Sequence, residues 1–316
     1  MKAAVVNVLG QPPQYQEFAE PSPMDGEVLV NVRAAGLHPI VKALAAGSHY
    51  AGKGELNVVP GIDGVGTLDD GSRVYFGVAR KPWGTFSERT VAPRSRCFSL
   101  PDDLDDAQAA AIANPGMSAW LSIKERARLK SGESVLILGA TGVAGQLAIQ
   151  AARHLGAARI VAAGRNLEVL ASQNLDAVIS LMQPEDAIRD AFAAETGKGI
   201  DVVIDYLWGR PTELLLEALS RGFDPNATRS TRLIEVGESA GKSISLPGAT
   251  LRSIDLTVMG SGFGSFPLQG VLDAIPTLFR LAAAGTLRVA VEPLPLAEVA
   301  SAWNRKESGR RIVLTT

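Results

Sequence analysis

The residues whose types and spacing could do chemistry begin with a glycine-rich segment, Gly139–Gly145, which reads GATGVAG. The apolar run before it, Val135–Leu138, is typical of a strand buried on both faces of a parallel sheet. After it, apolar residues recur at helical spacing up to Leu155, and a second β-rich run covers Ile160–Ala163. This order of strand, glycine turn, helix and strand forms the unit that binds a dinucleotide pyrophosphate at a helix N-terminus.

The glycines of this segment have separate expected tasks. Against the pattern G-x-G-x-x-G, Ala140 replaces the first glycine, whereas Gly142 and Gly145 remain. Gly142 would let backbone N–H groups approach the phosphates without a Cβ, and Gly145 would let the helix pack closely on the strand. The alternative is an ordinary glycine-containing turn, which the flanking strands and helix make the weaker interpretation. We therefore expect cofactor contacts from these residues of the turn: Gly139, Thr141, Gly142, Val143 and Ala144.

The end of the second strand decides which dinucleotide fits. An NAD site usually has Asp or Glu here to bind the ribose 2′-hydroxyl, but this chain reads Gly164-Arg165-Asn166. No carboxylate is present, Gly164 leaves space, and Arg165 offers planar donors that suit a phosphate. We infer NADP(H) rather than NAD(H), with all three residues at the cofactor. The alternative is that Arg165 is a solvated surface arginine and the cofactor is NAD(H).

Strands and helices continue to alternate up to about residue 260, which predicts a doubly wound parallel sheet. Loops at the carboxyl ends of its strands should line the cofactor cleft, and four of their residues join the predicted site: Leu207, Gly237, Ser261 and Gly262. Residues 1–114 are β-rich and dense in glycine and proline, which suits a barrel-like domain. Two helices, Asp102–Asn114 and Pro115–Leu129, should connect the domains. We expect a Rossmann domain over 115–260 and a return of 261–316 to the first domain.

Composition limits the classes of partner. The chain has 316 residues and a net charge of −2, which gives no reason to expect nucleic acid or an acidic membrane surface. We recognise no signal peptide and no apolar stretch long enough to span a membrane. The single cysteine, Cys97, excludes an internal disulfide and fits the reducing cytoplasm.

Several segments carry a family resemblance: Ala35–Pro39, Val59–Gly66, Gly84–Glu88 and Gly116–Trp120. Together they resemble zinc-independent medium-chain dehydrogenases/reductases of the NADPH:quinone oxidoreductase type. The resemblance implies a GroES-like β-barrel domain that carries a Rossmann domain. It also implies a homodimer joined near Leu256–Met259, where an apolar edge strand would favour pairing with a second chain.

The resemblance further implies three site residues. Tyr50 matches a family tyrosine that faces the substrate, and Ser118 matches a threonine near the nicotinamide. His38 replaces a family asparagine, and an ordinary histidine pKa of about 6.5 would suit proton delivery. Each has a plainer alternative: an exposed loop tyrosine, a capping or packing serine, and a turn histidine bonded to backbone. We predict Tyr50 and His38 as the catalytic residues.

A catalytic zinc needs at least three protein ligands, and we find no matching set of cysteines and histidines, so no metal is expected. The resulting hypothesis is an NADPH-dependent oxidoreductase that transfers hydride to a small molecule, either a quinone or an α,β-unsaturated carbonyl. Two alternatives stay open. One is an enoyl-thioester or carbonyl reductase, and the other is an NADPH-binding structural or redox-sensing protein with little turnover.

Overall fold

The structure is a computed structural model that describes residues 1–77, 79–221, 230–306 and 309–316. It divides into two compact units, Met1–Asn114 with Ile275–Thr316, and Pro115–Ala274. The first division between the units follows Asn114, and the second falls between Ala274 and Ile275. The segment after the last Rossmann strand stays with the second unit because Ser261 N–H donates to the Glu235 carbonyl at 2.7 Å.

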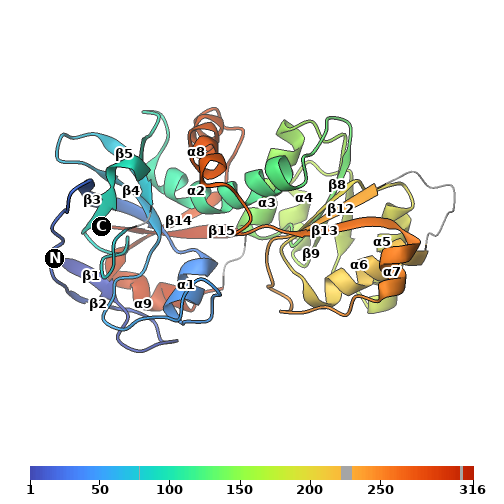
Figure 1. Ribbon diagram of the computed structural model, residues 1–316, viewed down its shortest axis with the longest axis horizontal. Coiled ribbons are helices and arrows are strands. Elements are labelled where there is room, and N and C mark those ends of the chain that lie inside the picture. The colour runs from blue at the N-terminus through green and yellow to red at the C-terminus, as the bar shows by residue number, and fades with distance from the viewer. Residues whose placement is uncertain (78, 222–229, 307–308) are drawn as a thin grey trace. The chain divides into compact units, whose positions relative to one another are not determined.

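The second unit contains a six-stranded sheet in the order β10-β9-β8-β11-β12-β13 (Figure 1). Every adjacent pair in it is parallel. The strands are β8 (Ser134–Leu138), β9 (Arg159–Gly164), β10 (Ala177–Ser180), β11 (Val202–Asp205), β12 (Ser230–Glu235) and β13 (Asp255–Gly260). The chain starts at the centre, moves to one edge, and then returns to build the other half. This order makes a topological switch point between β8 and β11, where ligands bind in doubly wound sheets.

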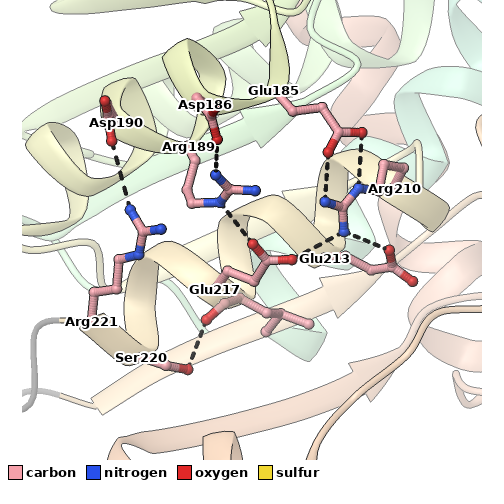
Figure 2. A network of polar contacts seen from close by, with 10 residues as sticks. Glu185, Asp186, Arg189, Asp190, Arg210, Glu213, Glu217, Ser220 and Arg221 are labelled. Atoms are coloured by element: carbon pink, nitrogen blue, oxygen red, sulfur yellow. Dashed lines mark hydrogen bonds and ion pairs between the residues drawn. The ribbon is translucent and has the colours of Figure 1, made fainter.

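The helices of this unit are α3 (Val143–His154), α4 (Leu167–Ala171), α5 (Glu185–Thr196), α6 (Gly209–Arg221) and α7 (Gly248–Ser253). Their apolar faces bury a core that includes Leu136, Phe192 and Leu215. Figure 2 shows α5 beside α6, with ion pairs joining their exposed sides. Arg210 contacts three glutamates of these two helices.

The first unit is β-rich. Its strands are β1 (Lys2–Val5), β2 (Gln14–Glu17), β3 (Glu27–Gly36), β4 (Asp63–Thr67), β5 (Arg73–Gly77), β6 (Arg89–Pro93), β7 (Cys97–Ser99), β14 (Ala290–Pro295) and β15 (Arg310–Thr315). The main sheet has the order β14-β15-β3-β4-β5-β7, with β6 also paired to β3. The C-terminal strand β15 therefore lies beside β3, and the chain's last residues complete the domain that its first residues began. The first unit also contains two short helices, α1 (Pro39–Ala45) and α9 (Val299–Trp303).

The two helices predicted around Pro115 are wrong in number and extent. One helix, α2 (Asp106–Leu121), contains Pro115 in its interior and continues as a π-helical turn over Ser122–Arg126. A proline inside a helix costs about 3 kcal/mol. Residues on both sides of it are buried, including Ile112 and Trp120, so packing outweighs the lost hydrogen bond. Another helix, α8 (Leu268–Ala283), contains the second boundary between the units.

None of the described helices is both long enough and apolar enough to cross a membrane.

Candidate functional site

The glycine turn between β8 and α3 has the geometry of a binding turn, with one correction to its expected glycines. Gly139 has φ +79° and makes the tight turn, so the first glycine's task falls on Gly139 and not on Ala140. Its N–H donates to the Ala163 carbonyl at 3.0 Å. A Cβ on Gly145 would lie 2.4 Å from the Gly139 carbonyl oxygen, which explains the close approach of α3 to the strand.

No close contact within the protein requires a glycine at position 142. It is the N-cap of α3 with φ −74°, and a Cβ there would meet protein atoms no closer than 3.5 Å. The first amides of a helix have no acceptor within the helix, and no side chain caps α3. The exposed surface over Gly142, with Val143 and Ala144 behind it, therefore fits a phosphate group that needs these amides and the space of a missing side chain.

The end of β9 presents one cationic side chain beside this turn. A Cβ on Gly164 would lie 2.5 Å from Thr141 Cγ2, so glycine allows the two loops to touch. Arg165 is exposed and follows immediately. Asn166 has a structural task, because its Oδ1 accepts from Glu168 N–H at 3.2 Å and thereby caps α4. The guanidinium of Arg165 has the charge and the planar donors that pairing with an extra ribose phosphate needs.

The loop after β11 contacts the glycine turn, and the loop after β12 contacts the end of β11. The Leu207 side chain would lie 3.1 Å from a Cβ on Gly139, and Gly237 N–H donates to the Asp205 carbonyl at 3.2 Å. Asp205 is buried and shapes the loop: Oδ1 accepts from Leu207 N–H at 2.8 Å and from Trp208 N–H at 3.0 Å. These bonds hold Trp208 in the left-handed region, with φ +53°. The sequence analysis missed Asp205, although a carboxylate that ends a buried strand was a usable signal.

The remaining Rossmann residues form a serine chain. Ser122 Oγ donates to the Ser118 carbonyl at 2.6 Å and lies 2.7 Å from Ser261 Oγ. Gly262 N–H donates to Ser265 Oγ at 2.7 Å, which fixes the turn after β13. Ser118, Ser261 and Gly262 therefore have structural contacts, with Ser122 bridging Ser118 and Ser261, and their contact with a cofactor stays a prediction.

The two predicted catalytic residues differ sharply in their surroundings. Tyr50 is 76% exposed, and its ring centroid lies 4.2 Å from that of His49. His38 is fully buried at the start of α1. Burial and the positive charge of Arg311 hold the pKa of His38 well below its usual range. The expectation of an ordinary histidine pKa is therefore wrong, since that value applies to a solvated imidazole.

His38 belongs to a buried polar cluster of the first unit that the sequence analysis did not identify. His38 Nε2 lies 3.6 Å from Asp63 Oδ1, and Tyr75 Oη donates to Asp63 Oδ2 at 3.0 Å. Arg311 Nη1 donates to the Leu37 carbonyl at 2.9 Å. Burial raises the pKa of Asp63 to about 7, although the Tyr75 hydroxyl and the Arg311 charge act in the opposite direction. Within the described ranges, no group of three or more His, Cys, Asp or Glu side chains is placed to hold a metal ion.

Comparison with known proteins shows to which family the chain belongs. No protein-family model matches the sequence. The human quinone oxidoreductase is 30% identical over 253 residues, which cover 75% of this chain and 75% of the human protein. The chain belongs to the quinone oxidoreductase family.

Other members of the quinone oxidoreductase family match along the whole chain. A probable NADPH-dependent quinone reductase of Emericella nidulans is 26% identical, with 99% of each chain covered. The quinone oxidoreductase of Thermus thermophilus, whose structures include its complex with NADPH, is 25% identical. It matches with a TM-score of 0.82 over 100% of both chains. The predicted fold class, a Rossmann domain with a GroES-like β-rich domain, is confirmed.

Proposed function

We propose that this family member is an NADPH-dependent oxidoreductase that transfers hydride to a quinone or to an α,β-unsaturated carbonyl. The observation that carries the proposal is the N-terminus of α3 at Gly142, which no side chain of its N-cap residue caps, together with the exposed Arg165 that follows Gly164, a neighbour of Thr141 in the same turn. Family membership supports the quinone class of acceptor over thioesters and simple carbonyls.

The protein's part in the reaction is to hold and orient the cofactor. The amides of Val143 and Ala144 would hold the pyrophosphate, and Arg165 would pair with the 2′-phosphate. The loops that contain Leu207 and Gly237 would line the cleft at the strand ends. The bound dinucleotide supplies the hydride, and the surrounding protein supplies position and exclusion of water.

Tyr50 and His38 have different proposed tasks because one is exposed and the other is buried. Tyr50 would donate a hydrogen bond to the substrate oxygen, and His38 would supply a proton from within the first unit. Tyr50→Phe should lower kcat/KM and leave NADPH affinity unchanged. If a double variant that lacks both the Tyr50 hydroxyl and the His38 imidazole keeps full activity, the proton comes from solvent.

Three finer properties belong to the same proposal. The redox step uses no metal, so purified active protein should contain well under one zinc per chain. The protein works in the cytoplasm, where its free Cys97 would stay reduced. It forms a homodimer through the edge strand β13, whose Val258 is 37% exposed.

The experiment that tests the function is an NADPH-oxidation screen over quinones, enones, enoyl thioesters and aldehydes. We expect quinones or enones to give the highest kcat/KM. Preferred turnover of thioesters or aldehydes would replace the proposed substrate class with the alternative reductases. NADPH binding without turnover of any acceptor would identify a structural or redox-sensing protein.

A further inference from the structure

The carboxyl end of β10 exposes a methionine close to the proposed 2′-phosphate site. Among the described residues from 115 to 221, the large apolar side chains that are exposed are Leu167, Val178 and Met182. Val178 lies within β10, whereas Met182 follows the end of that strand and is 67% exposed. A single exposed apolar side chain is common on protein surfaces, so its neighbours decide what it can bind.

Strand pairing brings the segment of Met182 beside that of Arg165. β9 and β10 are parallel, and their last residues, Gly164 and Ser180, are paired in the register. The amide that follows Ser180 donates to the Gly164 carbonyl at 2.9 Å, so the pairing continues past the strand ends. Met182 is two residues beyond Ser180, and Leu167 is three residues beyond Gly164. Two exposed apolar side chains and one exposed guanidinium therefore occupy adjacent segments at the same edge of the sheet.

The backbone of both segments is held by hydrogen bonds. Asn166 Oδ1 accepts from the N–H groups of Glu168 and Val169, which fixes Leu167 as the first residue of α4. Met182 N–H donates to Ser180 Oγ at 3.4 Å. The apolar side chains are thus presented to solvent on ordered turns.

The structure of the dinucleotide decides what reaches this surface. If Arg165 pairs with the 2′-phosphate, the adenine base lies close to Arg165, because base and phosphate are bound to neighbouring carbon atoms of one ribose. The pyrophosphate at the β8–α3 turn holds the other end of the adenosine, so the base lies on the β9–β10 side of the switch point. A leucine and the polarizable sulfur of a methionine suit the flat face of a purine.

We propose that Leu167 and Met182 form the surface on which the adenine base packs, and that oxidation of the Met182 thioether to the sulfoxide lowers the affinity for the dinucleotide. The inference rests on the proposed function. It extends the cofactor site from the phosphates to the base and assigns a modification site there.

The oxidant of this step is a peroxide. The O–O bond of hydrogen peroxide breaks, an S–O bond forms at Sδ of Met182, and one molecule of water leaves. The sulfur loses the two electrons that the peroxide gains. The resulting sulfoxide is polar and hydrated, so it no longer packs on the purine face. Methionine sulfoxide reductases reverse this oxidation, so the change in affinity is reversible.

The other sulfur atoms of the chain provide references for this chemistry. Met24, in the first unit, is 64% exposed, and Met117 and Met259 are half-buried. Burial raises the pKa of the Cys97 thiol, which disfavours the thiolate that reacts with peroxides. Met24 is therefore a matched internal control, since it is as exposed as Met182 but far along the chain from the dinucleotide turn.

The first test follows oxidation of the two exposed methionines in the purified full-length protein. Hydrogen peroxide is added with and without saturating NADP⁺, and mass spectrometry of peptides measures the sulfoxide at Met182 and at Met24. We expect NADP⁺ to slow the oxidation of Met182 by at least about threefold, because the base covers its sulfur, and to leave Met24 unchanged. Equal rates at Met182 with and without bound NADP⁺ would overturn the proposal.

The second test measures the affinity for 2′,5′-ADP, which carries the base and the 2′-phosphate but no nicotinamide. Peroxide should weaken the affinity of the wild type by at least about threefold. It should leave Met182→Leu unchanged, because leucine keeps an apolar surface and forms no sulfoxide. Met182→Gln should bind weakly without peroxide. Val178→Gln makes the same kind of replacement within β10 and should bind as the wild type does.

These results separate the inference from the function on which it rests. If peroxide weakens the wild type and Met182→Leu equally, or if Met182→Gln binds as tightly as the wild type, the adenine surface and its oxidation site are wrong and the proposed function stands. If the untreated wild type binds neither 2′,5′-ADP nor NADPH, the proposed function itself fails.

Discussion

At the scale of single residues, two glycines of one motif are glycine for opposite reasons. A Cβ on Gly145 would meet a backbone carbonyl of its own protein at 2.4 Å, whereas a Cβ on Gly142 would meet protein atoms only at ordinary contact distance. Gly145 is therefore required by the fold, whereas no protein atom requires a glycine at Gly142, and we propose that a bound phosphate does. The glycine pattern predicted both positions, but only the distances separate their tasks.

This separation predicts a matched pair of variants. Gly142→Ala should weaken NADPH binding by about tenfold or more with little change in Tm, because the methyl group occupies the path of the phosphate. Gly145→Ala should lower stability by roughly 1–3 kcal/mol, because backbone atoms must move. Fluorescence titration with NADPH and thermal denaturation measure the two effects. If Gly142→Ala binds NADPH with wild-type affinity, the cofactor phosphate does not bind at this turn.

The raised pKa of Asp63 predicts how stability depends on pH. The folded protein holds this proton up to about pH 7, whereas an unfolded chain releases it near the ordinary value of 3.8. Between pH 3.8 and about 7, unfolding therefore releases the proton of Asp63. The free energy of unfolding consequently falls as pH rises through this range.

We expect the Tm of Asp63→Asn, relative to wild type, to rise by at least about 5 °C between pH 4 and pH 8. Thermal denaturation over a pH series in constant ionic strength measures the difference. A Tm difference that stays constant with pH would mean that Asp63 titrates with an ordinary pKa.

At the scale of elements, sequence patterns predict the parts whose contacts are local. The strand, turn and helix from Ser134 to His154 appear as expected, because their apolar spacing and glycines specify them directly. Pro115 shows the limit of such reasoning. A local rule predicts a helix boundary there, but the burial of neighbouring residues from α2 keeps the helix continuous.

The ion-pair network between α5 and α6 is a second element-scale feature (Figure 2). Arg210 contacts Glu185 at 2.6 Å and Glu213 and Glu217 at 3.0 Å each, so its loss leaves three carboxylates without their shared cation. Isolated exposed ion pairs contribute little, but one cation shared by several carboxylates contributes more.

We predict that Arg210→Gln lowers the denaturation midpoint at low salt, and lowers it by less at 1 M NaCl, where charges are screened. Arg221→Gln on the same helix is the control, because Arg221 reaches only Asp190, at 3.6 Å, among the pairs of this network. Denaturant titration at both salt concentrations makes the comparison. Equal losses in the two variants would show that the network adds nothing to single pairs.

At the scale of the whole molecule, the sequence predicts which strand ends carry the cofactor site but not which side chains gather in the core. The Rossmann residues follow from one motif and one strand order. The partners of His38 come from β4, β5 and β15, and their meeting depends on pairings between segments far apart in the chain. A histidine in a turn and an aspartate beside glycines therefore gave no sign of the buried cluster.

The prediction at the scale of the whole molecule concerns which edge strand forms the interface of the proposed homodimer. β10 and β13 are the two edges of the Rossmann sheet, and each exposes a valine. If the proposed homodimer forms through β13, Val258→Lys should convert it into a species with the mass of one 33.2 kDa chain, because a charge opposes strand pairing. Val178→Lys on β10 should leave the dimer intact. Light scattering coupled to size exclusion reads both masses, and a dimer in both variants would place the interface elsewhere.

The central claim is that a dinucleotide with a 2′-phosphate binds at the β8–α3 turn and is selected by Arg165. The most direct measurement is the affinity of the purified protein and of Arg165→Ala for NADPH and for NADH. Wild-type protein should bind NADPH at least about tenfold more tightly than NADH, and the variant should lose most of that difference while its NADH affinity changes little. Equal affinity of the wild type for the two dinucleotides would contradict the account.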